Sequence, residues 1–113
     1  MIKPKNFSKK SFAIYGLGLT GKSVIKFLKK NDAFNYIAWD DLKKNRSQFK
    51  KKITSTFFLK SLNTVDHIII SPGININKTK FNRTILKNKH KIITDLDLFY
   101  LFNKNCKTIV VTG

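Results

Sequence analysis

The sequence predicts an α/β fold, in which a doubly wound parallel sheet carries helices on both faces and so forms three layers. Three observations predict it. Short apolar runs alternate along the chain with segments of helical or polar character. A glycine-rich turn joins the first apolar run directly to the first of these segments. A later run ends in three consecutive isoleucines, without the alternation of a half-exposed strand, as is typical of a strand covered on both faces.

The first two strands and the helix between them are the clearest elements. Residues 12–15 (FAIY) form a short apolar run that stops at glycine, which predicts a buried strand. Residues 20–30 predict an amphipathic helix, because apolar side chains mark one face and lysines the other, and the Asn-Asp pair at 31–32 ends it. Residues 36–39 (YIAW) predict the second strand. A helical crossover makes these two strands parallel, with a right-handed connection.

The middle of the chain has weaker periodicity. Residues 42–52 predict a polar helix. Residues 55–59 (STFFL) predict a short third strand, since β-branched and aromatic side chains favour strands. Residues 65–70 (VDHIII) predict a fourth strand, which ends at the Ser-Pro-Gly turn of residues 71–73 because proline fixes φ and glycine tolerates positive φ.

The C-terminal third continues the alternation. A helix is expected around residues 81–86, and residues 91–94 (KIIT) predict a short fifth strand. Asp95 is the expected cap of an apolar helix over residues 96–101. Residues 108–112 (TIVVT) predict a last buried strand, which ends at Gly113.

Length and cysteine content limit the class of protein. At 113 residues the chain has room for one compact domain and not for a second. Cys106 is the only cysteine, so no internal disulfide forms and a reducing compartment is expected. No apolar segment reaches the roughly 20 residues that span a bilayer. We therefore expect a cytoplasmic protein without a membrane partner.

The formal net charge of +17 raises the alternative of a nucleic-acid-binding module, which would bind DNA or RNA with a steep salt dependence. The lysines are scattered over nearly every predicted helix and loop, and the densest run, residues 43–52, is typical of a solvated face. The sequence has no aromatic-basic motif and no recognition helix. We expect no nucleic-acid partner. His67, His90 and Cys106 do not form a metal-binding pattern, and no metal is expected.

Residues 16–21 fit the pattern G-x-G-x-x-G between a predicted strand and a predicted helix. Gly16 permits the tight turn, Gly18 lets a phosphate approach the backbone, and Gly21 lets the helix pack close to the strand. The helix N-terminus offers free N–H donors to an anion. Asp40 ends the second strand, where a carboxylate would meet a ribose hydroxyl or a base edge. These features alone indicate a Rossmann-like site for NAD(H), and a regulatory NAD(H)-binding domain is the alternative to the interpretation that follows.

Four segments occur together in the order and spacing of one enzyme family. They are IYGLGLTG at 14–21, SPGI at 71–74, TDLDLF at 94–99 and IVVTG at 109–113. In these segments the chain resembles the Mur ligases of peptidoglycan synthesis, and most of all their D-glutamate-adding members. The resemblance covers nearly the whole chain, and the conjunction is more specific than any single segment.

The resemblance implies a Rossmann-like domain that holds UDP-N-acetylmuramoyl-L-alanine rather than a dinucleotide. The diphosphate is expected at the glycine-rich turn, held by the backbone N–H groups of Leu19 and Thr20 and by the Thr20 hydroxyl. Asp40 and Asp41 are expected at the uracil end, and Gly73 beside the uridine. The remaining residues expected at the site are the substrate-binding Gly18 and Gly21 and the turn-forming Gly16, Ser71 and Pro72.

One position departs from the family pattern. Family members often carry Thr or Ser and then Arg after the strand-end Asp, whereas this chain has Asp41 and Leu42. A polar or cationic contact is therefore missing there, and Lys43 or Lys44 is the candidate substitute.

The resemblance also implies how the chain is divided. Residues 1–106 are expected to be the substrate-binding domain, and residues 107–113 the first strand of a truncated ATP-binding domain, with Thr112 and Gly113 opening its phosphate loop. The reaction implied is ATP-dependent amide formation, in which an acyl phosphate is attacked by the amine of D-glutamate. ATP and Mg²⁺ belong to the full-length enzyme. The chain itself is expected to be a monomeric fragment with no cofactor and no catalytic residue, inactive alone.

Overall fold

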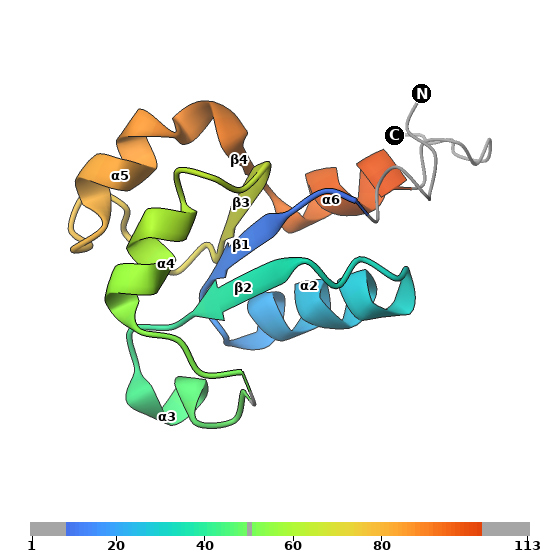
Figure 1. Ribbon diagram of the computed structural model, residues 1–113, viewed down its shortest axis with the longest axis horizontal. Coiled ribbons are helices and arrows are strands. Elements are labelled where there is room, and N and C mark those ends of the chain that lie inside the picture. The colour runs from blue at the N-terminus through green and yellow to red at the C-terminus, as the bar shows by residue number, and fades with distance from the viewer. Residues whose placement is uncertain (1–8, 50, 103–113) are drawn as a thin grey trace.

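The computed structural model describes residues 9–49 and 51–102, with the side chains of residues 101 and 102 left aside (Figure 1). The elements in chain order are β1 (Phe12–Tyr15), α2 (Leu19–Lys30), β2 (Tyr36–Trp39), α3 (Lys43–Arg46), α4 (Ser55–Ser61), β3 (His67–Ile70), α5 (Asn82–Lys87), the 3₁₀ helix η1 (Lys89–Lys91), β4 (Ile92–Ile93) and α6 (Asp95–Phe102).

The four described strands form one sheet in the order β2-β1-β3-β4, and every neighbouring pair is parallel. Phe12 of β1 lies beside Tyr36 on one side and His67 on the other. Strands β2 and β3 therefore flank β1, and the carboxyl ends of these three strands meet at one edge. The predicted parallel α/β sheet is confirmed.

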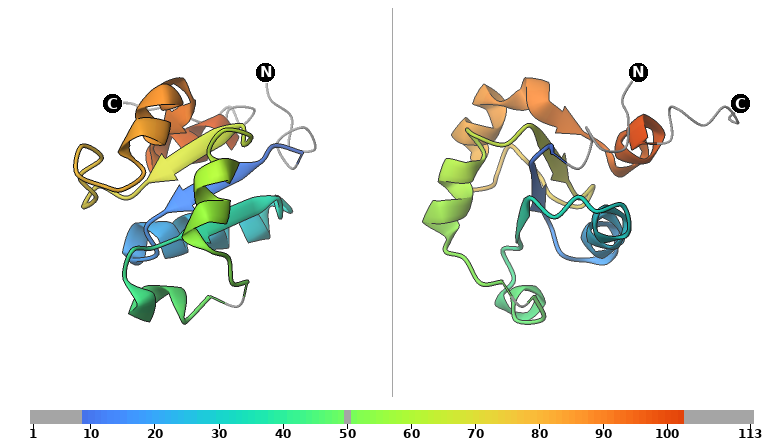
Figure 2. Two further views of the ribbon diagram at one scale, coloured as in Figure 1. Left: turned by 60° about the vertical axis from the view of Figure 1, so that its left-hand side comes forward. Right: turned by 45° about the vertical axis from the view of Figure 1, so that its right-hand side comes forward.

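Helices cover both faces of the sheet, so the predicted three layers are also confirmed. Alternate residues of β1 point to opposite faces, as the period of a strand requires. Phe12 and Ile14 belong to a core cluster that includes Val24 and Leu28 of α2 and Leu98 of α6. The opposite cluster combines β1 and β3 with α4 and α5, and its buried members are Ala13, Tyr15, Trp39, Phe58, Leu62, Val65, Ile68, Phe81 and Ile85. Figure 2 shows α2 and α6 on one side of the strands and α4 and α5 on the other.

The segment predicted as a third strand at residues 55–59 is instead helix α4, so that prediction was wrong. Thr54 caps this helix, because its side chain accepts a hydrogen bond from the backbone N–H of Phe57 over 3.0 Å. Phe58 is fully buried, whereas Phe57 is 51% exposed. A helix places only one of the two phenylalanines in the core and leaves the other in solvent.

Two further expectations need correction. The polar helix expected over residues 42–52 is limited to the four residues of α3, none of which is buried, so no apolar face extends it. Thr94, not Asp95, caps α6: the Thr94 hydroxyl accepts from the N–H of Asp97, and the Asp97 carboxylate accepts from the N–H of Thr94. This reciprocal pair is a capping box with aspartate in the place of glutamate. The strand predicted at residues 108–112 lies outside the described residues, as does the expected domain boundary at residue 106.

Candidate functional site

Three loops meet at the carboxyl edge of the sheet, one after each of β1, β2 and β3. The N–H of Gly16 donates to the carbonyl of Trp39 over 2.7 Å, and the N–H of Ser71 donates to the carbonyl of Tyr15 over 2.9 Å. These bonds tie the loop after β1 to β2, and the loop after β3 to β1. The connections run in opposite directions from β1, and such a switch point is where open α/β sheets bind ligands.

Glycines shape the turn between β1 and α2. Gly16 has φ +111°, a conformation that other residues rarely adopt, and a Cβ there would lie 2.7 Å from the Cβ of Ser71. A Cβ on Gly21 would overlap the carbonyl oxygen of Gly16, so this glycine allows α2 to pack close to the end of β1. A Cβ on Gly18 would meet nothing within 4 Å, which leaves the backbone there open to an incoming group.

The N-terminus of α2 presents unused donors. The N–H groups of Leu19, Thr20 and Gly21 and the Thr20 hydroxyl make no hydrogen bond with the part of the chain that the structure describes. The first turn contains no acidic residue, and Gly18 at the N-cap has no side chain to accept from these amides. The positive end of this 12-residue helix is therefore uncompensated and suited to an anion.

Asp40 is buried at the end of β2, with 9% of its surface exposed. One carboxylate oxygen accepts from the N–H of Leu17 over 2.7 Å and from the Asn45 amide over 3.2 Å. The other oxygen accepts from the N–H of Leu42 over 2.8 Å. Asp40 thus fastens the loop after β1 to the loop after β2, and it keeps one acceptor position in reserve.

Asp41 joins a second network. Its carboxylate accepts from the Tyr15 hydroxyl over 2.6 Å and from the Trp39 indole N–H over 3.2 Å. The Tyr15 hydroxyl also lies 2.5 Å from the hydroxyl of Thr79. Burial, followed by the hydrogen bond to Asp41, raises the pKa of Tyr15 well above its ordinary range. Tyr15 therefore stays a neutral donor that holds Asp41 in place.

Arg46 supplies a cation behind this edge. Its guanidinium donates to the carbonyl oxygens of Asp40 over 2.8 Å and Asp41 over 3.1 Å, and it lies 4.3 Å from the centroid of the Trp39 ring. Lys43 and Lys44, the substitutes suggested by the sequence, are exposed on α3 and do not line the cleft described below. Arg46 was not predicted from the sequence as a site residue, because its position depends on the short helix α3.

The loop after β3 forms the third wall. The N–H of Ile74 donates to the carbonyl of Ser71 over 3.0 Å, which closes a turn around Pro72 and Gly73. The Ser71 side chain faces Gly16, and a Cβ on Gly73 would point into open space.

These walls enclose one cleft of about 420 Å³. Its lining includes most of the residues expected from the sequence, namely Gly16, Gly18, Leu19, Thr20, Asp40, Asp41, Ser71, Pro72 and Gly73. Gly21 does not line the cleft, and the expected Thr112 and Gly113 lie outside the described residues. The cleft is also lined by Leu42, Asn45 and Ile74, which were not predicted from the sequence as site residues. Ile74 directly follows the Ser-Pro-Gly turn and could have been included on that ground.

Two negative findings apply to the described residues alone. No group of three or more His, Cys, Asp or Glu side chains is placed to hold a metal ion within that part of the chain. None of its helices is long and apolar enough to cross a membrane.

Comparison with known families gives the decisive match. The family model described as "Mur ligase MurD-like, N-terminal domain" matches residues 10–94. The chain belongs to this Mur ligase family. The matched span of the MurD-like domain contains all three loops that line the cleft. The resemblance inferred from the sequence motifs is thus confirmed.

Curated relatives of this MurD-like chain carry the name UDP-N-acetylmuramoylalanine--D-glutamate ligase. A protein of Francisella tularensis subsp. tularensis (strain WY96-3418) is 40% identical over an alignment of 101 residues, which covers 87% of this chain and 21% of that protein. A protein of Rickettsia prowazekii (strain Madrid E) is 32% identical over an alignment of 115 residues, which covers 95% of this chain and 24% of that protein. The chain therefore spans about a fifth to a quarter of the length of these relatives. No solved structure gave a match.

Proposed function

We propose that the cleft binds the uridine diphosphate end of UDP-N-acetylmuramoyl-L-alanine, and that the chain is the substrate-binding domain of a D-glutamate ligase of peptidoglycan synthesis. One observation carries the proposal: the uncompensated N-terminus of α2 opens into a cleft that two strand-end loops complete. A diphosphate is the kind of group such a helix end favours. The names of the curated relatives indicate which nucleotide compound is involved.

In this proposal the diphosphate lies on the N–H groups of Leu19 and Thr20 and accepts a further hydrogen bond from the Thr20 hydroxyl. None of these donors is used within the described part of the chain. Gly18 leaves room for the phosphate to approach the backbone, because no atom lies within 4 Å of where its Cβ would be.

The uracil end would lie between the loops after β2 and β3. Uracil presents one N–H donor between two carbonyl groups, so a carboxylate acceptor suits it. Asp40 keeps one acceptor position free, and Asp41 is exposed at the rim of the cleft. Gly73 forms the opposite wall without a side chain that would fill the space.

The complete reaction is part of the same proposal. Binding of ATP and Mg²⁺ and attack by D-glutamate would depend on segments that the longer relatives contain, with residues 107–113 as the start of the ATP-binding domain. The role of residues 9–102 would be to hold the nucleotide end of the substrate in a fixed position, in a cytoplasmic enzyme.

The proposal is tested by thermal unfolding of the chain with UDP-N-acetylmuramoyl-L-alanine, UDP or NADH at equal concentration. A ligand that binds the folded state alone raises the melting temperature. Both uridine compounds are expected to raise it, and NADH is not. Stabilisation by NADH alone would instead support a regulatory NAD(H)-binding domain, and no response to either uridine compound would refute the proposal.

A pair of variants locates the site. Thr20→Val removes the hydroxyl expected to bind phosphate and should weaken binding of UDP roughly tenfold, since a hydrogen bond to a charged group is lost. Thr56→Val is the control, because Thr56 is exposed on α4 and lines no part of the cleft. Equal affinities of the two variants would show that the N-terminus of α2 does not hold the phosphate.

A further inference from the structure

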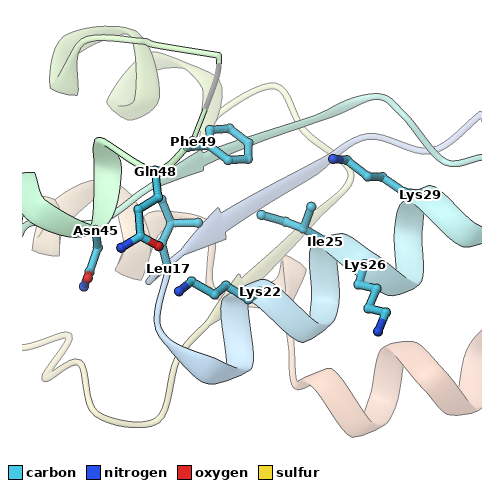
Figure 3. A pocket seen from close by; sticks show the side chains of 8 residues that line it. All are labelled: Leu17, Lys22, Ile25, Lys26, Lys29, Asn45, Gln48 and Phe49. Carbon is cyan, nitrogen blue, oxygen red and sulfur yellow. The ribbon is translucent and has the colours of Figure 1, made fainter.

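A second depression runs along α2 and adjoins the candidate cleft, because Asn45 lines both. It consists of two adjoining hollows of about 340 Å³ and about 320 Å³, which share Lys29, Gln48 and Phe49. We call the two together the lysine groove. Figure 3 shows the first hollow, with lysines extending from α2 along one wall and Gln48 and Phe49 on the other.

The floor of the lysine groove is apolar. In the first hollow it is formed by Leu17, Ile25 and Phe49. In the second hollow Phe34 and Tyr36 continue it, with the rings of Tyr36 and Phe49 6.4 Å apart. Phe34 is 61% exposed, although it is a large apolar side chain. Such a floor is suited to apolar side chains of a ligand.

The rim of the groove is cationic. Lys22, Lys26 and Lys29 lie at helical spacing on one face of α2, and Lys51 lines the second hollow. Among the described residues that line the groove, none is acidic. Within the same part of the chain, none of these four ammonium groups forms an ion pair or a hydrogen bond. The groove therefore carries positive charge that no ion pair within residues 9–49 and 51–102 neutralises.

We propose that the lysine groove binds an extended acidic segment of a partner protein, which places apolar side chains on the floor and carboxylates against the lysines. Charge complementarity selects an acidic partner. In an extended segment successive side chains point to opposite sides, so one segment can face both the floor and the rim. Two hollows in line along a helix fit an extended chain better than a compact anion.

Other occupants fit the groove less well. A second copy of this chain is disfavoured, because each copy has 23 Lys and Arg against 6 Asp and Glu and the copies repel one another. A single-stranded nucleic acid could place phosphates against the lysines and stack bases on the aromatic part of the floor. It would leave the aliphatic part, Leu17 and Ile25, without an apolar partner. The proposal does not depend on what the candidate cleft binds.

The test uses two labelled synthetic peptides, one of alternating Glu and Leu and one of alternating Glu and Ser, with binding to the full chain followed by fluorescence anisotropy. The Glu-Leu peptide is expected to bind more tightly, because the peptides carry the same charge and only the first has side chains for the floor. Equal binding of the two peptides, or no binding of either, would overturn the proposal.

Two triple variants that remove the same positive charge distinguish binding in the lysine groove from nonspecific electrostatic attraction to the protein. The triple variant Lys22→Gln, Lys26→Gln, Lys29→Gln should bind the Glu-Leu peptide about tenfold more weakly. The control triple Lys30→Gln, Lys60→Gln, Lys87→Gln removes the same charge from exposed positions outside both hollows and should change affinity less than about twofold. Similar losses in both triples would show unspecific attraction and overturn the proposal.

A single substitution and two competitors complete the test. Gln48→Glu places a negative charge where the hollows meet and should weaken peptide binding without lowering the melting temperature. Single-stranded DNA and anionic lipid vesicles serve as competitors. If either one binds through Lys22, Lys26 and Lys29 more tightly than the peptide does, the groove has a different occupant and the proposal is wrong.

Discussion

At the scale of single residues, Gly16 shapes both the backbone turn after β1 and the wall of the cleft next to Ser71. Its positive φ turns the chain from β1 toward α2, and the missing side chain leaves space for Ser71 from the loop after β3. Gly73 lines the same cleft, but a Cβ there would meet no neighbour within 4 Å. The two glycines therefore form a matched pair for testing what the turn requires.

We predict that Gly16→Ala lowers the free energy of unfolding by about 2–4 kcal/mol, because alanine is strained at positive φ and its methyl group overlaps Ser71. Gly73→Ala should change it by no more than about 0.5 kcal/mol. Denaturant unfolding of both variants measures the difference. A Gly16→Ala variant as stable as the parent chain would show that the turn can relax.

Much of the candidate cleft could be predicted at this scale, because its residues directly follow apolar runs. The glycine-rich turn, Asp40 and the Ser-Pro-Gly turn each come at a strand end, and parallel strands bring their carboxyl ends to one edge. Asn45 could not be predicted, since it reaches the cleft through the fold of α3. The role of Tyr15 was also hidden, because a tyrosine inside an apolar run indicates burial and says nothing of its hydroxyl partner.

At the scale of elements, α4 shows where sequence patterns were insufficient. The segment STFFL has a strand-like composition, yet propensity is a weak preference that packing overrides. The centroid of the Phe58 ring lies 5.8 Å from that of Tyr15 and 5.5 Å from that of Phe81. These contacts form with the segment in a helical conformation, and Thr54 caps the start of that helix. Strands β1, β2 and β3 were predicted well because each is a short apolar run that contributes buried residues to the core clusters on both faces of the sheet.

Ser11 and Asp66 link the starts of two neighbouring strands. The carboxylate of Asp66 accepts from the backbone N–H of Ser11 over 2.8 Å and from the Ser11 hydroxyl over 3.1 Å. The backbone hydrogen bond from Ser11 holds the pKa of Asp66 below its ordinary value. Folding therefore favours the ionised carboxylate over the protonated form.

We predict that Asp66→Asn is less stable than the parent chain at neutral pH. Because the pKa of Asp66 is lower in the folded than in the unfolded state, its contribution is complete above about pH 4 and is lost as the pH falls through the folded-state pKa. The stability difference should therefore shrink in acid. Denaturant unfolding between neutral and strongly acidic pH measures it, with Asp32→Asn as a control. A difference independent of pH would contradict the prediction.

At the scale of the whole molecule, the main electrostatic feature is the formal net charge of +17 on 113 residues. The lysines that line the lysine groove make no ion pair within the described part of the chain, so their mutual repulsion is unrelieved. Repulsion of this kind destabilises a compact state, and dissolved salt screens it.

We predict that raising the sodium chloride concentration from low to moderate ionic strength increases the melting temperature by roughly 2–5 °C. The charge-reduced triple variant at Lys30, Lys60 and Lys87 should melt higher than the parent chain in low salt and respond less to added salt. Scanning calorimetry of both proteins provides the measurement. A melting temperature that is constant or falls with salt would show that charge repulsion does not significantly lower the stability of the folded chain.

Trp39 provides a spectroscopic signal at the candidate cleft. It is the single tryptophan of the chain, its indole N–H donates to Asp41 at the rim of the cleft, and the Arg46 guanidinium lies over its ring. The fluorescence of an indole ring changes with the charges and hydrogen bonds around it. The domain therefore contains a natural fluorophore at the site where a ligand would displace or reorient those charges, and occupancy can be followed in the unlabelled protein.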